Sequence, residues 1–163
     1  MEKIKYLLHV LILLLFTVGC KQGSIVELNK KVVDNICYEV SLLPKEFLEQ
    51  NDTVSIADLI YLKLTVYEEK NTMRIQELFK QANYNKLLYY VNSRITNDFS
   101  LIQSEKAYNP IQVYFENNNR IGNKLVFLLA FEKKDLNMSD DIVLRFNDNI
   151  FNNGFIQLAF NKK

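Results

Sequence analysis

Apolar and polar side chains alternate along the segment Leu59-Ile60-Tyr61-Leu62-Lys63-Leu64-Thr65-Val66-Tyr67. One face carries Ile60, Leu62, Leu64 and Val66, and the other carries Tyr61, Lys63, Thr65 and Tyr67. Because successive side chains of a strand point to opposite faces of a sheet, this pattern predicts a β-strand with one buried face.

Further strands are predicted on both sides of this segment. Ile36 to Leu42 alternates in the same way and ends shortly before Pro44. Leu125 to Phe131 is apolar at every position, which predicts a central strand covered on both faces. The predicted strands are 36–42, 59–67, 96–103, 111–116, 124–132, 142–146 and 155–160. About seven short strands of this kind predict a mostly β protein with the architecture of a β-sandwich.

Two asparagine-rich segments are predicted to close hairpins between these strands. One is 117–123, which contains Gly122, and the other is Asn152-Asn153-Gly154. Asparagine and glycine favour such turns because both tolerate the left-handed backbone conformation.

One stretch departs from the period of two. Apolar residues stand at helical spacing within Met73 to Ala82 and again within Asn85 to Ser93. Asn71 or Thr72 is expected to be the N-cap of the first helix. The sequence therefore predicts a short helical insertion at residues 72–93, with its apolar stripes packed on one sheet or across one end of the sandwich.

The chain begins with the pattern of a secretion signal. Two lysines precede an apolar run from Leu7 to Val18 that is broken only by His9. The run is shorter than the roughly 20 residues that a membrane-spanning helix needs. Gly19 and Cys20 follow, in an arrangement similar to the lipobox where a bacterial signal peptide is cut and the new N-terminal cysteine is acylated. We therefore expect a lipoprotein in which Cys20 carries palmitate or similar chains, and several acyl chains anchor a protein stably.

The predicted domain organisation follows from the lipoprotein signal. Residues 1–19 are the predicted signal peptide, residues 20–31 the acylated cysteine and a tether, and residues 32–163 a single β-sandwich domain. No proline-rich or glycine-serine linker interrupts the last of these.

Removal of the signal changes the charge and the chemistry of the chain. The 163 residues contain 20 lysines and arginines, 19 aspartates and glutamates, and one histidine. The signal takes two basic residues, one acidic residue and the histidine, so the mature chain has eighteen charges of each sign and no histidine. Nucleic acid is therefore an unexpected partner. The lack of histidine excludes histidine triads and histidine-ligated zinc, copper or haem, and no cofactor is expected.

The other reactive side chains give little sign of catalysis. Cys37 lies inside an apolar strand and is expected to be a buried core residue. Glu68-Glu69 would point to opposite faces of a strand, and Asp140-Asp141 is expected in a solvated turn, so neither pair is placed as glycosidase carboxylates are. We predict that the protein is not an enzyme.

The order of the segments resembles the outer-membrane lipoprotein of type VI secretion, the TssJ family. The likeness covers about Tyr38 to Phe160 and depends on four features in order: Leu64-Thr65-Val66-Tyr67, Glu77-Leu78-Phe79, Tyr84, and Val126-Phe127-Leu128-Leu129-Ala130-Phe131. This resemblance implies a transthyretin-like β-sandwich that is lipid-anchored in the outer membrane and faces the periplasm. It also implies a structural adaptor that binds the periplasmic part of an inner-membrane partner and so tethers a trans-envelope secretion complex.

In that family the loop between the first two strands contacts the partner. The resemblance implies that this role falls on Pro44 to Ser55, and the candidate partner-binding residues are Lys45, Glu46, Phe47, Leu48, Glu49, Asn51 and Asp52. An aromatic anchor within a polar rim suits a small interface. The alternative is that Phe47 and Leu48 tuck back under the loop.

A second function stays open from the sequence, a lipid-anchored periplasmic lipoprotein that binds a small ligand or a toxin, because a fold does not determine function. The two differ in the surface that they need. An adaptor is expected to have a modest, flat, partly apolar patch, and a ligand binder is expected to have a concave pocket with convergent polar groups. Lys21 follows Cys20 where an inner-membrane retention signal would have aspartate, so the outer membrane is the expected location.

Overall fold

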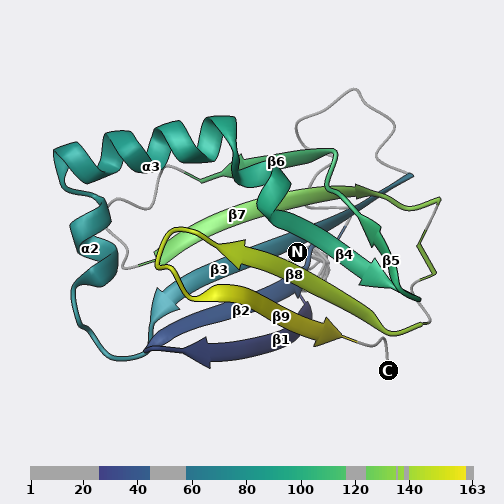
Figure 1. Cartoon of the computed structure of the whole chain (residues 1–163). Helices are drawn as coiled ribbons and strands as arrows, with labels where there is room; N and C mark the ends of the chain where they lie inside the picture. The colour runs from purple at the N-terminus through teal and green to yellow at the C-terminus, as the bar shows by residue number, and fades with distance from the viewer. Residues whose placement is uncertain (1–25, 45–57, 117–123, 135, 138–139, 161–163) are drawn as a thin grey trace, which may run out of the picture.

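Two antiparallel β-sheets pack face to face in the computed structural model, which describes residues 26–44, 58–116, 124–134, 136–137 and 140–160 (Figure 1). The first sheet has the order β1 (Val26–Val33), β2 (Ile36–Leu42), β3 (Leu59–Glu68), β7 (Lys124–Glu132), β6 (Gln112–Phe115). The second sheet has the order β5 (Lys106–Tyr108), β4 (Phe99–Gln103), β8 (Ile142–Asp148), β9 (Gly154–Phe160). The mostly β class and the β-sandwich are thus confirmed.

All seven predicted strands are present, with small shifts at their ends. β7 has the predicted bounds and lies between β3 and β6, as expected of a strand that is apolar on both faces. β4 begins later than predicted because Ile95–Asp98 forms the 3₁₀ helix η3. The hairpins β6–β7 and β8–β9 are both paired, although the turn at 117–123 lies outside the described residues.

Two strands were not predicted from the sequence. β5 is only three residues long and pairs with β4 at the edge of its sheet. β1 includes residues 26–31, which were expected to be a tether; that expectation was wrong, since these residues pair with β2 from Val26 opposite Leu42 to Lys31 opposite Tyr38. A register shift between Glu27 and Asn29 and several charged side chains, as edge strands often have, obscure the period of two in β1.

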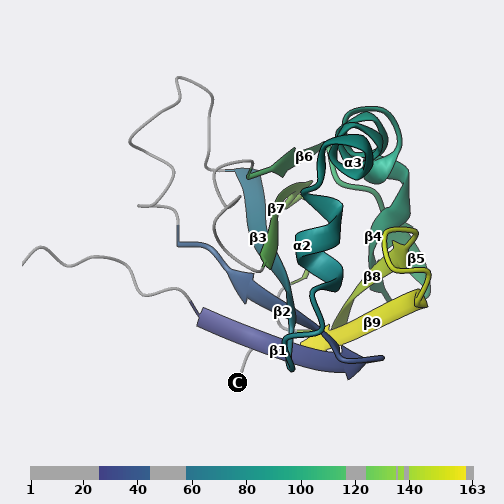
Figure 2. The same cartoon turned by 90° about the vertical axis from the view of Figure 1, so that its left-hand side faces the viewer.

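The helical insertion forms two helices that cover an end and an edge of the sandwich (Figure 2). α2 (Arg74–Leu78) lies across one end between the sheets, where Ile75 is fully buried. α3 (Gln81–Ser93) runs along the edge near β6 and buries Leu87 and Val91. The first helix is therefore shorter than the predicted 73–82, and the second begins earlier than predicted.

The N-cap prediction for the first helix was wrong. The N-cap residue is Met73, with a φ of 64°, and its side chain makes no capping hydrogen bond. Glu68 takes this role from the end of β3, because its Oε1 accepts hydrogen bonds from the backbone N–H groups of Arg74 at 2.5 Å and Ile75 at 3.3 Å. The Thr72 hydroxyl donates to the same oxygen at 2.8 Å. A carboxylate supplied by the preceding strand thus satisfies the first turn of the helix.

The core between the sheets is built around stacked aromatic rings. Phe99 of β4 and Phe146 of β8 stack with their centroids 4.5 Å apart, and Phe127 of β7 lies 5.9 Å from Phe99 across the sandwich. Each of these side chains is at most 1% exposed. Rings from both sheets therefore interlock in one core, at separations where aromatic pairs attract.

A buried polar network joins the two sheets at the end covered by α2. The Tyr38 hydroxyl of β2 donates to Asp148 Oδ2 of β8 at 2.5 Å and accepts from the side-chain amide of Asn153 at 2.7 Å. Asp148 Oδ1 accepts from the backbone N–H groups of Ile150 and Phe151, each at 3.0 Å. Burial, and then the hydrogen bond to Asp148, raise the pKa of Tyr38 well above its ordinary range. The network fixes the β8–β9 turn against β2.

The sandwich has two distinct ends. The Val26 end holds the start of β1, the end of β2 at Leu42 and the end of β7 at Glu132, as the strand register requires. The α2 end holds the β1–β2 turn, the end of β3, α2 and the β8–β9 turn; Arg74 of α2 donates to the carbonyl oxygen of Asp34 at 3.0 Å there. In Figure 1 the α2 end is on the left.

Candidate functional site

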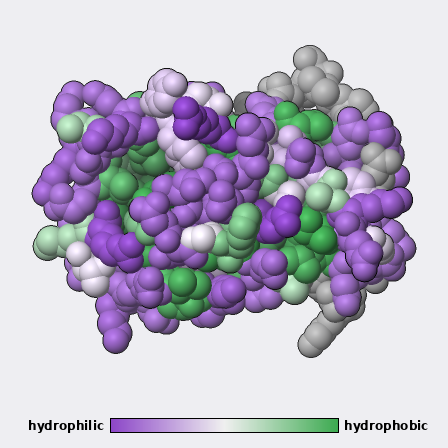
Figure 3. Space-filling model, in the orientation of Figure 1, coloured by the Kyte–Doolittle hydropathy of each residue, from purple (hydrophilic) through white to green (hydrophobic). Residues whose placement is uncertain are grey.

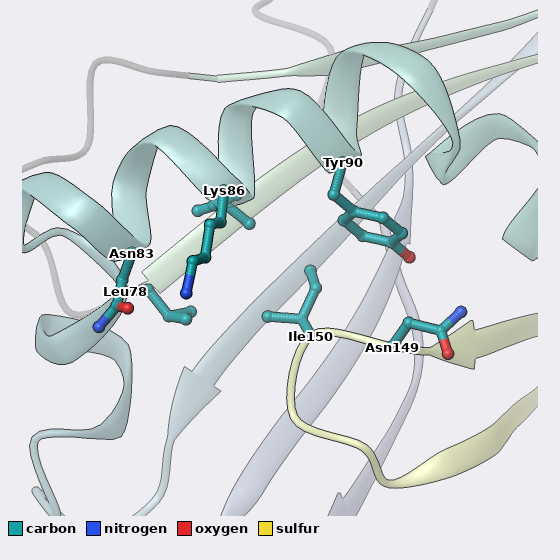
Figure 4. A pocket seen from close by; sticks show the side chains of 7 residues that line it. Leu78, Asn83, Lys86, Tyr90, Asn149 and Ile150 are labelled. Carbon is teal, nitrogen blue, oxygen red and sulfur yellow. The ribbon is translucent and has the colours of Figure 1, made fainter.

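A groove of about 280 Å³ opens between α3 and the β8–β9 turn, near the α2 end (Figure 4). Figure 3 shows apolar surface in a recess of this region, framed by hydrophilic residues. The lining residues come from both helices and the turn: Leu78, Asn83, Lys86, Leu87, Tyr90, Asn149 and Ile150.

Helical spacing brings the α3 side chains to one side of the groove. Asn83, Lys86 and Tyr90 are separated by three and four residues, so they lie on consecutive turns of one helix face. Leu87 beside them is 5% exposed and fixes α3 to the core. Ile150, from the β8–β9 turn, forms the opposite wall and also packs against the core. The groove is therefore bounded by anchored elements.

The polar end of the groove is organised by Asp98 of η3. Its Oδ2 accepts a hydrogen bond from the Tyr90 hydroxyl at 2.6 Å, and its Oδ1 accepts from the side-chain amides of Asn147 at 3.1 Å and Asn149 at 3.0 Å. Burial, and then the hydrogen bond to Asp98, raise the pKa of Tyr90 well above its ordinary range. Tyr90 and Asn149 are thus held in fixed orientations.

Among the described residues that line the groove, Lys86 supplies the only charge. Its side chain is exposed and extends from α3 into the space between Leu78 and Ile150 (Figure 4). Within the described ranges its ammonium makes no ion pair or hydrogen bond. Asn83, one turn earlier, links α3 to α2, since its side-chain amide donates to the carbonyl oxygen of Glu77 at 3.0 Å. The groove therefore combines an apolar floor with one cation that has no partner in the described part of the chain.

The predicted lipidation and partner-binding residues lie outside the part of the chain that the structure describes. These are Cys20 and all seven candidate residues from Lys45 to Asp52. The two flanks of that loop, Pro44 and Asp58, belong to the Val26 end, where the Lys133 N–H donates to the Asp58 carbonyl oxygen at 2.8 Å. The groove and the start of the predicted partner loop are therefore at opposite ends of the sandwich.

The other residues considered from the sequence have structural or solvated positions. Cys37 is 2% exposed with a free thiol, as predicted for a core residue. Asp140 and Asp141 are exposed, as predicted for a solvated turn. Across the part of the chain that the structure describes, no group of three histidine, cysteine, aspartate or glutamate side chains is placed to hold a metal ion. In the same part of the chain, no helix has both the length and the apolar character to cross a membrane.

Sequence reasoning missed the groove, because the apolar stripes of the helices were assigned to the core alone. One signal was present: Lys86 is the only charged residue in the thirteen residues of α3, so no acidic neighbour on the helix can pair with it. The wall contributed by Ile150 had no signal, since it depends on how the β8–β9 turn folds back toward α3.

A scan against protein-family models, a search of curated proteins and a search of solved structures each found no match.

Proposed function

We propose that this protein is a lipid-anchored structural adaptor of the outer membrane. In this role it tethers a trans-envelope, type VI-like secretion complex by binding the periplasmic part of an inner-membrane partner. The proposal combines the lipobox-like pattern at Cys20, the resemblance of the segment order to the TssJ family, and the position of β1 in the fold.

The observation that supports it best is the short distance along the chain between the anchor and the fold. β1 begins at Val26, with only five residues between it and Cys20. Even fully extended, this connection spans about 20 Å. An acylated Cys20 would therefore hold the Val26 end next to the membrane and leave the α2 end directed into the periplasm. In this arrangement the Val26 end is the membrane side of the protein.

The groove supports binding in preference to catalysis. Its Tyr90 and Asn149 side chains are already bound to Asp98, and its apolar lining consists of leucine and isoleucine side chains. A surface with an apolar lining and fixed polar groups is suited to binding a complementary side chain. Under the proposal, Pro44, the first residue of the predicted contact, lies on the membrane side, and the α2 end is the part of the protein closest to the inner membrane.

The test is a pull-down from solubilised envelopes with the natively lipidated protein, followed by mass spectrometry. We expect a large inner-membrane protein with a periplasmic domain to co-purify, and we expect Phe47→Asp combined with Leu48→Asp to weaken its recovery. The matched control is Lys106→Glu, an exposed change on β5 outside the loop and the groove. Recovery of no protein partner in repeated preparations would contradict the adaptor function.

A second candidate is supported by one observation, the groove itself. A concave site with polar groups at its edges is what a lipid-anchored periplasmic ligand- or toxin-binding lipoprotein needs. Native mass spectrometry of the purified protein distinguishes the two, because a small molecule retained in the absence of any protein partner would favour this second function.

A further inference from the structure

We infer that the groove beside α3 binds a segment of a protein partner in which an apolar side chain stands next to a carboxylate. The inference rests on the proposed adaptor function and adds a contact that the sequence did not predict. It assigns recognition of that segment to the floor of the groove and to Lys86.

The size of the groove favours an anchoring side chain. At about 280 Å³ it falls just below the range of roughly 300–1,000 Å³ that is typical of small-molecule sites. Leu78 and Ile150 are half-buried and offer apolar surface that an incoming leucine or phenylalanine side chain would cover. A small apolar recess in a surface is the kind of place where one anchor residue of a partner is buried.

The charge of the groove favours an acidic neighbour for that anchor. Lys86 is unpaired among the described residues and stands over the apolar floor. Asp98, the carboxylate at the polar end of the groove, already accepts hydrogen bonds from Tyr90, Asn147 and Asn149. A carboxylate on the partner would therefore meet a cation that has no acidic partner among the described residues, and such complementarity determines register and specificity.

The position of the groove favours a partner that approaches from the periplasm. The groove lies near the α2 end, and the five residues between Cys20 and Val26 would hold the other end at the membrane. Its walls are anchored by the buried Leu87 and by the Asp98 network, so little of the site needs to be ordered on binding. A preformed site loses less conformational entropy when it is occupied.

The first test is an NMR titration of the detergent-solubilised, lipidated protein with two peptides that differ in one group. The probes are acetyl-Gly-Leu-Phe-Glu-Gly-amide and its Glu-to-Gln counterpart. We expect amide shifts at Lys86, Leu87 and Ile150, and about fivefold tighter binding of the acidic peptide, the size of effect that an exposed ion pair supports. Added salt should remove this preference and leave the neutral peptide unaffected.

Matched variants distinguish recognition by Lys86 from a general effect of the protein's charge. Lys86→Glu should reverse the preference between the two peptides, Lys86→Arg should keep it, and Lys106→Glu, an equivalent charge change on β5, should leave it unchanged. Equal affinities for the two peptides, or shifts that spread away from the groove, would overturn the inference. So would a native mass spectrum in which a small molecule occupies the wild-type protein and is lost from Lys86→Glu.

The second test identifies the occupant in the envelope. A photoreactive Asn83→p-benzoylphenylalanine variant places the probe at the rim of the groove. The inference predicts a cross-linked protein segment in which an apolar residue adjoins aspartate, glutamate or a C-terminal carboxylate. A cross-linked segment without such a carboxylate, or a lipid adduct alone, would overturn it. The titration needs neither a membrane nor the native partner, so it tests peptide binding by the groove alone. The pull-down from envelopes tests the adaptor function, and the two proposals can therefore fail independently.

Discussion

The hydrogen bond between Tyr38 and Asp148 joins the two sheets within the buried polar network. The Tyr38 hydroxyl is the side-chain donor to Asp148 Oδ2, and Asp148 is 1% exposed. Tyr38→Phe removes this donor and leaves a buried carboxylate oxygen without its partner. We expect the free energy of unfolding to fall by about 2–3 kcal/mol, as for other buried charged acceptors. Urea denaturation measures the change.

The control for this prediction is Tyr89→Phe. Tyr89 lies on α3 and is 68% exposed, so loss of its hydroxyl should change stability by less than about 0.5 kcal/mol. Equal stability of the wild type and Tyr38→Phe would show that the hydrogen bond between Tyr38 and Asp148 contributes nothing net.

Glu68 makes the stability of the protein depend on pH. Partial burial raises its pKa, but the hydrogen bonds from the Thr72 hydroxyl and from the backbone N–H groups of Arg74, Ile75 and Thr72 together lower it below the ordinary 4.5. Since the folded state favours the carboxylate, the resulting stabilisation is present above pH 4.5 and is lost as the pH falls through the lower folded pKa.

Glu68→Gln tests this cap. The variant should lose about 1 kcal/mol at about pH 7, the usual contribution of a helix cap, and the difference from the wild type should shrink at about pH 3. Urea midpoints at the two pH values measure it. Glu69→Gln, at the exposed neighbouring position, is the control. A difference that is the same at both pH values would mean that the charge of Glu68 does not stabilise the helix.

Among the elements, those with strong local periodicity could be predicted, and those held by tertiary pairing could not. β3 and β7 bury whole faces, so their sequences carry the pattern. β1 is an edge strand with a register shift, and only its pairing with β2 makes it a strand. Likewise, the cap of α2 was missed because its carboxylate comes from β3, six residues before the first helical N–H that it binds.

The β8–β9 turn is predicted to need a residue that tolerates positive φ at position 154. Gly154 has a φ of 67°, and a Cβ added there would meet no atom within 4 Å. Gly154→Ala should therefore cost about 1 kcal/mol from backbone conformation alone. Gly154→Asn should cost less, because asparagine tolerates this region better. Thermal unfolding of the two variants measures the difference, and equal melting temperatures would contradict the backbone explanation.

At the scale of the whole molecule, the candidate groove depends on an assembly that a linear sequence does not display. Lys86 and Tyr90 share one helix face, which spacing can predict. Ile150 and Asn149 come from a turn some sixty residues later, and Asp98 from a separate 3₁₀ helix orients the polar end. Periodicity predicts which faces are buried, but it does not predict where two buried faces leave a gap between them.

The whole-molecule prediction concerns orientation at the membrane. If Cys20 is acylated, a label at the Val26 end lies close to the lipid surface and a label at the α2 end lies far from it. Lys133→Cys and Asn71→Cys, both at exposed positions of these two ends, provide single labelling sites, because Cys37 is buried. Relaxation by a lipid-bound paramagnetic chelate should then affect the label at position 133 much more strongly.

Cys20→Ser is the control for this orientation. It should move both labelled proteins out of the membrane fraction and abolish the difference between the two positions, because several acyl chains supply the anchoring. Tight membrane association of Cys20→Ser would contradict the lipid anchor. Strong relaxation at position 71 in the lipidated protein would instead keep the anchor and contradict the orientation, and the groove would then face the membrane and not the periplasm.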